Sequence, residues 1–586
     1  MPRGPREAER PNHLTWRHWL LAAAVALAMG ALLVRLALVQ VVDHERYLEE
    51  AAAARSGSET VVAPRGAILD ASGYPLATSI DTWDVYIDSF LWHDRERARV
   101  AAAGLGAALG LDFDTLYRNG TAQDRGDVIV LRQLDYEPGL ALRDEGLWGV
   151  RLLPTSRRVY AEGDLAGPLI GYVGLDGRGL WGVEADFDHV LRGHPGRVVG
   201  EHDPLGRPIA FTQPAERTPL IGGEVQLTID RFIQSIAERR LAEAIEANEA
   251  AGGTVIVLES RSGAILGMAS LPTVQLSAVD LNDDELVNLV RNRAVTDLYE
   301  PGSVLKTLTT AAAIDLGLVT PGTTYVDTGS VRVVDSVIRN WDFVAYGEVT
   351  MTEYLQRSLN TGAVWLSQLV GADAFYDYLA AFGIGESTHL GLAGEADGLL
   401  RRPEDDGWYP VDLATHAYGQ GLAATPLQVV MAVNAFANDG ALMRPQIVSQ
   451  VVTREGVRRF EPVRVRQVVT VETAQTVARM MLDVVEGAVE GAPPHRARVE
   501  GYHVAGKTGT TLVSIPTGYD LDTTIASFVG FLPYGAPRVT ILVKIDRPSG
   551  DSNLGGVVAA PVFARIAADI MEYLNVPTTD PQVSAP

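Results

Sequence analysis

The sequence predicts an α+β fold. A single N-terminal transmembrane helix is followed by an elongated α+β pedestal domain, and then by a larger domain with a central antiparallel sheet flanked by helices. Three observations predict this fold: a long apolar run near the N-terminus, a glycine-rich stretch of short strand-like runs, and helical patterns that alternate with a strand hairpin. At 586 residues the chain is too long for one ordinary core, so we expect several domains.

The composition indicates a folded protein, with 47% hydrophobic and 21% charged residues. The net charge of -24 argues against a nucleic-acid-binding surface, because neutralising phosphates requires clustered cations. Cysteine is absent, which excludes disulfides and thiolate metal sites. The 11 histidines show no metal-ligand spacing, and we expect neither a metal nor a cofactor.

The first strong feature is the apolar run 19–42, whose length suits a membrane-spanning helix. Four arginines precede it, so the positive-inside rule predicts that residues 1–18 are cytoplasmic and that everything after the helix is outside. The competing interpretation is a cleaved signal peptide. We favour the anchor because the run exceeds a usual signal core and no small-x-small cleavage site follows it.

Residues 43–223 form the predicted pedestal domain. A polar, helical stalk runs to about residue 56, and glycine-rich turns separate the short strands after it. Helical patterns are present at 95–109 and 138–145. No catalytic constellation is visible in this part, and its chemistry alone predicts a structural role.

Residues 224–574 form the predicted second domain, because a glycine pair precedes a new strand and an amphipathic helix, 231–251. A tight turn joins the strands 254–258 and 264–269, and this hairpin predicts an antiparallel sheet. We expect the polar tail 575–586 to be disordered. The other elements predicted here are strands at 225–229, 524–531 and 538–545 and a last helix near 561–573.

The candidate nucleophile is Ser303. Pro301 and Gly302 can end one segment, and Ser303 can cap the helix that follows as far as Leu316. Residues three apart lie on one face of a helix, so the Ser303 hydroxyl and the Lys306 amine are expected side by side. A serine beside an amine is a possible activated nucleophile.

Lysine is rare in this chain. It occurs only at Lys306, Lys507 and Lys544, so 46 of the 49 basic residues are arginine. A desolvated lysine can lose its proton and act as a base, whereas arginine almost never does. Composition bias could also leave three lysines behind by chance. The motifs around Lys306 and Lys507 favour a catalytic role for these two.

Three motifs follow one another along the chain. Ser303-Val304-Leu305-Lys306 alone is a weak signal, because Ser-x-x-Lys occurs by chance in many helices. Ser358-Leu359-Asn360 lies in a predicted helical segment, and Lys507-Thr508-Gly509-Thr510 opens an extended one. Taken singly, Ser358 could be an ordinary helix serine, Asn360 a cap and Lys507 a surface cation. Together and in this order the motifs occur in penicillin-binding proteins and serine β-lactamases.

The chain resembles a class B penicillin-binding protein, a monofunctional peptidoglycan D,D-transpeptidase of the division or elongation type, from the membrane helix to the last helix. Departures are Val304-Leu305, where Thr-Phe is commoner, and Thr511-Leu512, where Ala-Gln is often seen. No transglycosylase domain precedes the pedestal, which distinguishes class B from class A. The other stretches that carry the resemblance are 65–70, Arg158-Val159-Tyr160, 171–174, Gly182-Val183-Glu184, Gly419-Gln420-Gly421 and 526–531.

The resemblance implies the mechanism. Ser303 attacks the carbonyl between the two terminal D-alanines of a stem peptide, releases the last one and is left acylated. Lys306 acts as the base if burial and Lys507 lower its pKa. Ser358 passes the proton to the leaving amine, and Asn360 holds the substrate or Lys306.

The resemblance also assigns binding roles. The backbone N–H groups of Ser303 and Thr510 form the oxyanion hole. Lys507, Thr508, Gly509 and Thr510 form the substrate-binding strand, on which Lys507 and Thr508 hold the terminal carboxylate. An amine from a second stem peptide completes the cross-link, and β-lactams are the expected inhibitors. Glu395 and Asp397 lie in a glycine-rich loop, and we interpret them as a turn rather than as general acids.

The expected partners are those of the family: the cytoplasmic membrane, a polytopic glycosyltransferase of the shape, elongation, division and sporulation (SEDS) family, and other divisome or elongasome proteins. No nucleic acid is expected. The stretch 171–174 favours division, whereas Gly419-Gln420-Gly421 also occurs on the elongation side.

Other functions remain open. A membrane-bound D,D-carboxypeptidase would resolve the same acyl-enzyme with water. A β-lactamase is disfavoured because it needs no pedestal of this size. A β-lactam sensor or an idle scaffold is disfavoured because the five catalytic side chains are intact, and because residues 1–18 leave no room for a signalling domain.

Overall fold

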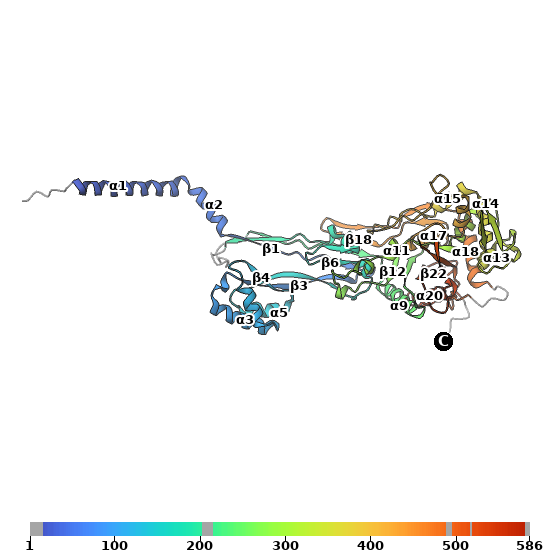
Figure 1. The fold of residues 1–586 in the computed structure, drawn as a ribbon, viewed down its shortest axis with the longest axis horizontal. Coiled ribbons are helices and arrows are strands. Elements are labelled where there is room, and N and C mark those ends of the chain that lie inside the picture. Colours follow the sequence, from blue (N-terminus) through green and yellow to red (C-terminus); the bar gives the residue numbers. More distant parts are fainter. Residues whose placement is uncertain (1–15, 202–214, 488–494, 516–517, 580–586) are drawn as a thin grey trace, which may run out of the picture. The chain divides into compact units, whose positions relative to one another are not determined.

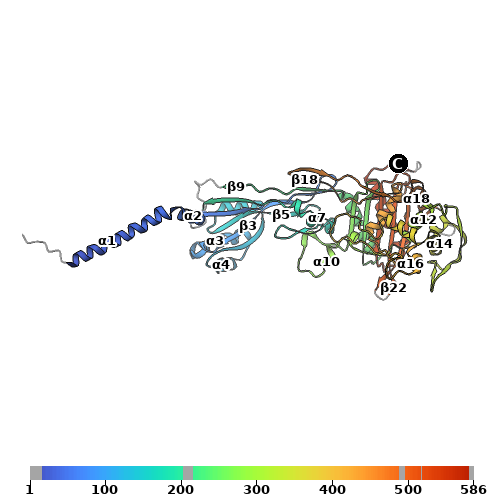
Figure 2. The same ribbon diagram turned by 90° about the horizontal axis from the view of Figure 1, so that it is seen from above.

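The computed structural model describes residues 16–201, 215–487, 495–515 and 518–579. The chain forms two compact units, and each combines separate stretches of sequence. The first unit consists of Met1–Ala63, Thr82–Thr155 and His194–Leu220. The second consists of Pro64–Asp81, Ser156–Gly193 and Ile221–Pro586. Figures 1 and 2 show the ribbon in two perpendicular views.

The N-terminal helix α1 (Trp16–Ala37) continues through a π-helical turn (Leu38–Val42) and is followed by α2 (His44–Arg55). An 18-residue stretch within Trp16–Val42 has a mean hydropathy of 2.3, and none of that stretch is buried. Among the described residues this is the one helix long and apolar enough to cross a membrane. The predicted apolar helix at 19–42 is confirmed, and residues 1–15 of the predicted cytoplasmic segment lie outside the described part.

The first unit packs three helices against a strand pair. Residues 82–88 of β3 (Pro75–Asp88) pair with β4 (Asp127–Asp135), and buried Trp92 lies in the core between them and the helices. Asp94 caps the first of these helices by accepting a hydrogen bond from the Arg97 backbone N–H. The other elements of this unit are α3 (Arg95–Leu109), α4 (Phe113–Gly120), α5 (Tyr136–Glu145), β1 (Ser56–Val61), β8 (Gly196–Glu201) and β9 (Ala215–Arg217).

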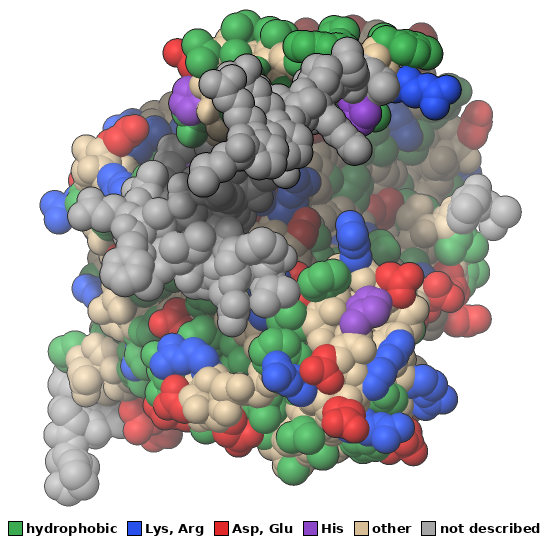
Figure 3. Space-filling model, turned by 90° about the vertical axis from the view of Figure 1, so that its left-hand side faces the viewer, with side chains coloured by type: hydrophobic (Ala, Val, Ile, Leu, Met, Phe, Trp, Pro, Cys, Tyr) green, Lys and Arg blue, Asp and Glu red, His purple; other side chains and the backbone are tan. Residues whose placement is uncertain are grey.

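The helices α3 and α5 carry exposed side chains of both charge signs, among them Arg95, Glu96, Arg143 and Asp144. Figure 3 shows basic and acidic side chains interspersed on the lower part of this face rather than separated into two fields. Neither charge sign dominates this lower part of the view.

The second unit is built on a five-stranded sheet in which every pairing is antiparallel, as the hairpin predicts. One row across the sheet reads Gly509, Ser527, Lys544 and Thr254, each residue facing the next on the neighbouring strand. The strand order is β12 (Ile265–Leu271), β11 (Gly252–Glu259), β23 (Val539–Asp546), β22 (Gly518–Leu532) and β21 (Ala505–Ile515). Because β21 is an edge strand, half of its backbone N–H groups point away from β22.

The two faces of this sheet bury different cores, because successive side chains of a strand point to opposite sides. On β11, Val255 and Val257 pack in a cluster with α9 (Arg231–Ala247) and α20 (Ala560–Tyr573). Ile256 and Leu258 pack in the other cluster, with α12 (Lys306–Asp315), α14 (Asn360–Val370) and α17 (Pro426–Ala437). The sheet thus separates two layers of helices, and every residue of α17 is buried.

The structure shifts some predicted boundaries. The helix predicted over 231–251 ends at Ala247, because Asn248 caps it. Residues 575–579 are described, and Thr579 N–H donates to the Gly501 carbonyl at 2.9 Å, whereas residues 580–586 of the predicted tail lie outside the described part. The remaining helices of the second unit are α6 (Gly167–Ile170), α7 (Gly182–Asp186), α8 (Asp188–Leu191), α10 (Leu286–Leu289), α11 (Arg293–Thr296), α13 (Met351–Arg357), α15 (Ala372–Ala381), α16 (Pro410–His416), α18 (Val471–Glu486) and α19 (Gly555–Val558).

Short strands complete the second unit. Residues 75–77 of β3 pair with β2 (Ile68–Leu69), which runs parallel to β10 (Glu224–Leu227). Two more strands, β18 (Val448–Thr453) and β19 (Gly456–Arg459), extend this sheet beyond β10. The other strands are β5 (Val150–Tyr160), which also enters the first unit, β6 (Tyr172–Val173), β7 (Gly179–Trp181), β13 (Thr324–Asp327), β14 (Ser330–Val333), β15 (Ser336–Arg339), β16 (Gly347–Thr350), β17 (Ala441–Met443) and β20 (Arg464–Gln467).

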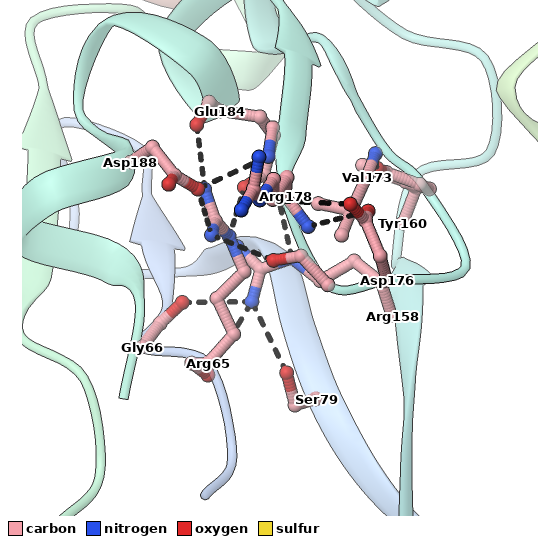
Figure 4. Close-up of polar contacts among 12 residues, drawn as sticks. Arg65, Gly66, Ser79, Arg158, Tyr160, Val173, Asp176, Arg178, Glu184 and Asp188 are labelled. Atoms are coloured by element: carbon pink, nitrogen blue, oxygen red, sulfur yellow. Dashed lines mark hydrogen bonds and ion pairs between the residues drawn. The ribbon is translucent and has the colours of Figure 1, made fainter. Parts of the chain in front are cut away.

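A buried charge cluster joins three motif stretches within the second unit (Figure 4). Glu184 is fully buried and accepts from Arg65 Nε at 2.6 Å and from Arg158 Nε at 2.7 Å. Arg65 also reaches Asp188, and Arg158 donates to the Gly66 carbonyl at 2.7 Å. Removing one partner of such a cluster leaves an uncompensated buried charge. These motif residues therefore tie together three segments that lie far apart in the chain.

Candidate active site

The candidate nucleophile lies in a short 3₁₀ turn. Gly302–Leu305 forms this turn, and the α-helix α12 begins only at Lys306. The prediction that Ser303 caps the helix is wrong, because Leu305 is the cap residue and no side chain caps this end. The backbone N–H groups at the start are instead taken up by the tighter 3₁₀ turn. Ser303 is partly buried.

Two glycines let the nucleophile turn lie directly on strand β21. Gly302 has a φ of +59°, and a Cβ there would lie 2.5 Å from Thr511 Cγ2. A Cβ on Gly509 would lie 2.7 Å from the Pro301 carbonyl oxygen. Thr511 Oγ1 donates to the Glu300 carbonyl at 3.0 Å. Both approaches need glycine, since any side chain would push the turn away from the strand that carries the third motif.

Lys306 is fully buried and directs its amine at the second motif. Its Nζ donates to the Ser358 carbonyl at 2.6 Å, to Asn360 Oδ1 at 2.8 Å and to Ser358 Oγ at 3.3 Å. An ammonium has three hydrogens and no acceptor, so this set occupies it completely. The structure thus brings Lys306 to Ser358 and Asn360, which follow it by more than 50 residues in the chain.

Lys507 approaches the same serine from β21. It is 1% exposed, and its Nζ donates to Ser358 Oγ at 3.0 Å and lies 3.3 Å from both oxygens of Thr508. Burial lowers the pKa of Lys507 to about 7. Burial, and secondarily the charge of Lys507, lower the pKa of Lys306 well below its usual value. Both buried amines therefore bond to the Ser358 hydroxyl, and each loses its proton at a lower pH than an exposed lysine does.

Within the described part of the chain, the Ser303 hydroxyl makes no hydrogen bond to either lysine. Lys306 gives its hydrogens to the Ser358 motif instead. A charged lysine cannot accept a proton from Ser303, whereas the neutral amine has a lone pair available. The lowered pKa of Lys306 thus supplies the protonation state that a base requires.

Ser358 lies at a break between two helices, so its prediction within a helical segment is wrong. Helix α13 ends at Arg357, and α14 begins at Asn360. Ser358 has left-handed backbone angles, φ +57° and ψ +47°, which cost a residue with a Cβ about 1 to 2 kcal/mol. In this conformation both its carbonyl and its hydroxyl meet Lys306. Neither glycine nor asparagine marks this position, so the sequence carries no signal for the break.

A buried polar network behind Asn360 was not predicted from the sequence. Asn340 Oδ1 accepts from the backbone N–H groups of Asn360 at 3.0 Å and Thr361 at 3.3 Å. Asn340 Nδ2 donates to both carboxylate oxygens of Asp327 at 3.0 Å, and Thr361 Oγ1 donates to Asp327 at 2.6 Å. Burial opposes ionisation of Asp327, but these hydrogen bonds hold its pKa below the usual value. The network fixes the start of α14.

Glu300 holds the other side of the nucleophile turn. Its Oε1 accepts from the Tyr519 hydroxyl at 2.8 Å and from the Gly421 N–H at 3.1 Å, and its buried Oε2 has no partner among the described residues. Burial raises the pKa of Glu300. Gly302 N–H donates to the Gly419 carbonyl. A Cβ added to Gly419 would lie 2.2 Å from the Gly302 oxygen, so only glycine fits there.

The remaining candidates are placed as follows. Thr510 Oγ1 accepts from Gly555 N–H at 2.9 Å. Glu395 accepts from the Thr388 N–H at 2.7 Å, which agrees with the turn interpretation. Lys544 is 2% exposed, pairs with Asp546 and lies 5.3 Å from the Tyr299 ring centroid, so all three lysines of the chain are buried. Among the described residues, no group of three or more His, Asp or Glu side chains could hold a metal ion.

Two family models match the chain. The model described as "Penicillin binding protein transpeptidase domain" matches residues 253–571, which is more than half of the chain. The model described as "Penicillin-binding Protein dimerisation domain" matches residues 60–227. The first match contains all three motifs, and the second contains most of the predicted pedestal.

Known proteins resemble the chain over nearly its whole length. Peptidoglycan D,D-transpeptidase FtsI of Escherichia coli (strain K12) is 31% identical over 574 residues, 97% of this chain and 94% of the relative. Probable peptidoglycan D,D-transpeptidase PenA of Neisseria gonorrhoeae is 30% identical and covers 99% of this chain and 96% of its own.

Solved structures agree with these relatives. The crystal structure of a peptidoglycan synthetase from Bifidobacterium adolescentis superposes with a TM-score of 0.72 at 26% identity and covers 91% of this chain and 99% of its own. Penicillin binding protein 3 from Mycobacterium tuberculosis, complexed with aztreonam, has a TM-score of 0.68 at 27% identity and covers 89% of this chain and 99% of its own. The chain therefore belongs to the class B penicillin-binding proteins, in which a dimerisation domain precedes a transpeptidase domain.

Proposed function

We propose that this chain is a membrane-anchored serine D,D-transpeptidase that cross-links peptidoglycan stem peptides through an acyl-enzyme on Ser303. The observation that carries the proposal is the buried pair of lysines, Lys306 and Lys507, which meet at Ser358 Oγ beside the nucleophile turn. Such a pair keeps one amine neutral as a base and leaves the other available as a cation for a carboxylate.

Acylation begins with proton removal from Ser303. Neutral Lys306 takes the hydroxyl proton as Ser303 Oγ forms a bond to the carbonyl carbon of the penultimate D-alanine. Ser358 Oγ lies 3.3 Å from Lys306 Nζ and is the path by which the proton reaches the leaving amine. The C–N bond then breaks, and the terminal D-alanine leaves with the proton on its amine.

Transition-state charge falls on the carbonyl oxygen. The backbone N–H groups of Ser303 and Thr510 are proposed to stabilise it, since the nucleophile turn lies against the free edge of β21. One such donor contributes about 10²- to 10³-fold to the rate. The support for this arrangement is that Gly509 has no side chain to separate the turn from the strand.

The terminal carboxylate of the substrate, or of a β-lactam, is proposed to bind at Lys507 and Thr508. The bound anion raises the pKa of Lys507 and keeps it charged, which in turn keeps Lys306 neutral. In the second half-reaction the amine of a neighbouring stem peptide attacks the ester and loses a proton to Lys306. The ester C–O bond then breaks, and Lys306 returns that proton to the leaving Ser303 Oγ. Water in place of the amine would make the enzyme a D,D-carboxypeptidase.

A fluorescent penicillin tests the acyl-enzyme. We expect one covalent label per chain on Ser303 and none on Ser303→Ala, and labelling that persists in the variant would refute the nucleophile. A stem-pentapeptide donor, given with and without an acceptor amine, then separates transfer from hydrolysis. Product that contains no acceptor, even when the acceptor is in excess, would favour the carboxypeptidase.

The N-terminus is proposed to be cytoplasmic and the second unit extracytoplasmic, because arginines precede the apolar helix. The absence of cysteine makes the test direct, since a single introduced cysteine is the only thiol. In intact cells a membrane-impermeant maleimide should label Asp335→Cys, which is exposed on the second unit, and should spare Glu7→Cys. The reverse pattern would overturn the orientation.

The anchor and the pedestal are proposed to bind a polytopic SEDS glycosyltransferase, with division favoured over elongation. The support is the family resemblance of residues 19–223. Co-purification that survives replacement of 19–223 would contradict this site of binding. A fluorescent fusion at the septum would support division, and one along the sidewall would support elongation.

A further inference from the structure

Two large aromatic side chains are exposed close to the second motif. Trp341 is 59% exposed and Phe343 is 75% exposed, and Val344 beside them is 44% exposed. They lie in the turn between β15 and β16. We call these three side chains the aromatic patch. They stand within four residues of one another in the chain, and exposed apolar side chains that gather on one part of a domain mark interaction sites.

The turn that carries the patch is held in a costly conformation. Phe343 has a left-handed φ of +61°, which residues with a Cβ rarely adopt. Its N–H donates to the Asn340 carbonyl at 3.1 Å, and Asn340 Nδ2 donates to the Val344 carbonyl at 3.1 Å. Asn340 itself is buried against Asp327. Strain that surrounding structure maintains around an exposed aromatic ring points to a function.

The turn that carries the patch is bonded to the second motif. Trp341 Nε1 donates to the Arg357 carbonyl at 3.2 Å, and Arg357 directly precedes Ser358. Asn340, directly before Trp341, accepts from the Asn360 N–H. Residues on both sides of Ser358 thus bond to Asn340 and Trp341, and a ligand on the Trp341 ring would lie near the motif.

The size of the patch limits what can cover it. An aromatic side chain offers at most about 250 Å², and two of them with a valine fall short of the roughly 800 Å² per partner that a stable protein interface buries. A small, flat, partly apolar group fits better. One face of a pyranose ring presents C–H groups, which are attracted to the negative face of an aromatic ring.

The proposed substrate supplies such a group at the right distance. Peptidoglycan consists of sugar strands whose stem peptides carry the reacting D-alanines. Four extended residues span about 14 Å, so the sugar at the base of a stem lies on the order of that distance from the bond that Ser303 attacks. The turn that carries the patch is bonded to the residues on either side of Ser358, which places it on the side of the site from which a stem of this length can extend.

We propose that Trp341 and Phe343 bind a sugar ring of the peptidoglycan glycan strand and so present glycan-attached stem peptides to the active site. This inference rests on the proposed transpeptidase function. The ring packs on the aromatic side chains, while its hydroxyl and N-acetyl groups stay in water or meet the polar rim of the turn. A free stem peptide reaches Ser303 without this contact.

Binding of peptide-free glycan strands, prepared by removing the stem peptides, tests the proposal on the full-length protein in detergent. We expect Trp341→Ala and Phe343→Ala each to weaken binding about tenfold or more, and Trp341→Phe to retain part of it. Phe90→Ala, which removes a 44% exposed aromatic ring from the other unit, is the matched control and should bind normally.

Penicillin acylation of Ser303 distinguishes this role from a merely structural one. In Phe343→Ala, whose side chain makes no described bond to the motif, the acylation rate should stay within about twofold of the wild-type rate, and cross-linking should fall for glycan-attached stems but not for free stem peptides. Unchanged glycan binding would overturn the proposal, as would an equal loss with free peptides. If wild-type Ser303 is not acylated at all, the proposed function fails instead, so the two failures are distinguishable.

Discussion

Lys306 and Lys507 donate hydrogen bonds to the same atom, Ser358 Oγ, at 3.3 and 3.0 Å. Both amines are buried, and the charge of Lys507 adds to the lowering of the Lys306 pKa. Ser358 can accept from both and can donate its own hydrogen. Proton transfer and substrate charge are therefore coupled at one hydroxyl, and the first predictions concern how that coupling depends on pH.

Acylation by a β-lactam should decline as the pH rises above about 7. In the free enzyme Lys507 has a pKa of about 7, so above that value it loses the positive charge that is proposed to bind the carboxylate. The second-order acylation rate constant reports the free enzyme, so stopped-flow measurements from pH 5.5 to 9.5 should show this alkaline decline. Lys507→Arg keeps its charge and should lose the decline, although its absolute rate is lower. If the acylation rate constant of this variant declines above pH 7 as it does in the wild type, a group other than Lys507 causes the decline.

Folding stability should rise with pH between about 7 and the ordinary lysine value. In this window the unfolded chain still binds the Lys507 proton, since its pKa there is about 10.4, while the folded chain has released it. Stability gains at most about 1.4 kcal/mol per pH unit from one such group. Urea unfolding at pH 7.5 and 9.5 should therefore show wild type gaining about 2 to 3 kcal/mol relative to Lys507→Met. A constant difference between the two proteins would contradict the buried, mostly neutral amine.

Ser358→Ala should lower acylation about 10²-fold or more. The variant removes the hydroxyl between the two lysines, and general acid–base groups contribute about 10²- to 10⁴-fold. Ser367→Ala is the matched control, because Ser367 is buried in α14 and its hydroxyl donates only to the Val364 carbonyl. Fluorescent-penicillin time courses compare the two. Equal rates in both variants would exclude Ser358 from the proton path.

Gly302→Ala should impair acylation through its contact with β21. The added Cβ would lie 2.5 Å from Thr511 Cγ2, and φ +59° disfavours alanine. Adding Thr511→Ser removes that methyl group but keeps the hydroxyl that donates to the Glu300 carbonyl. The double variant should recover part of the lost rate, the remainder reflecting backbone strain. No recovery would mean that φ strain, and not the contact, sets the cost.

Asn340→Ala should weaken both stability and acylation. It leaves the buried Asp327 carboxylate without two hydrogen bonds and frees the start of α14, and a loss of about 1 to 3 kcal/mol in unfolding free energy follows. Asn434→Ala is the control, because Asn434 is equally buried and bonds to Ser260 and Thr540. Both variants should unfold at lower urea, but only Asn340→Ala should lose about tenfold or more in acylation per folded molecule.

The site is only partly readable from the sequence. Lys306 and Lys507 stand out because lysine is so rare, and the spacing of three motifs names their partners. The left-handed Ser358 carries no such signal, since its partners Lys306 and Lys507 are far from it in the chain. Asn340 and Asp327 also escape sequence reasoning, because isolated polar residues look alike in a sequence whether they are buried or solvated.

The apolar N-terminal helix, the antiparallel hairpin and the order of the three motifs are predictable from the sequence, because length, periodicity and motif spacing are local properties. The 3₁₀ turn at Ser303, the start of α12 at Lys306 and the close approach of the turn to β21 at Gly302 and Gly509 became visible in the folded chain. The tertiary structure alone also placed both lysine amines on Ser358 Oγ. Those outcomes depend on contacts between segments far apart in the chain, where burial and close packing override local preference.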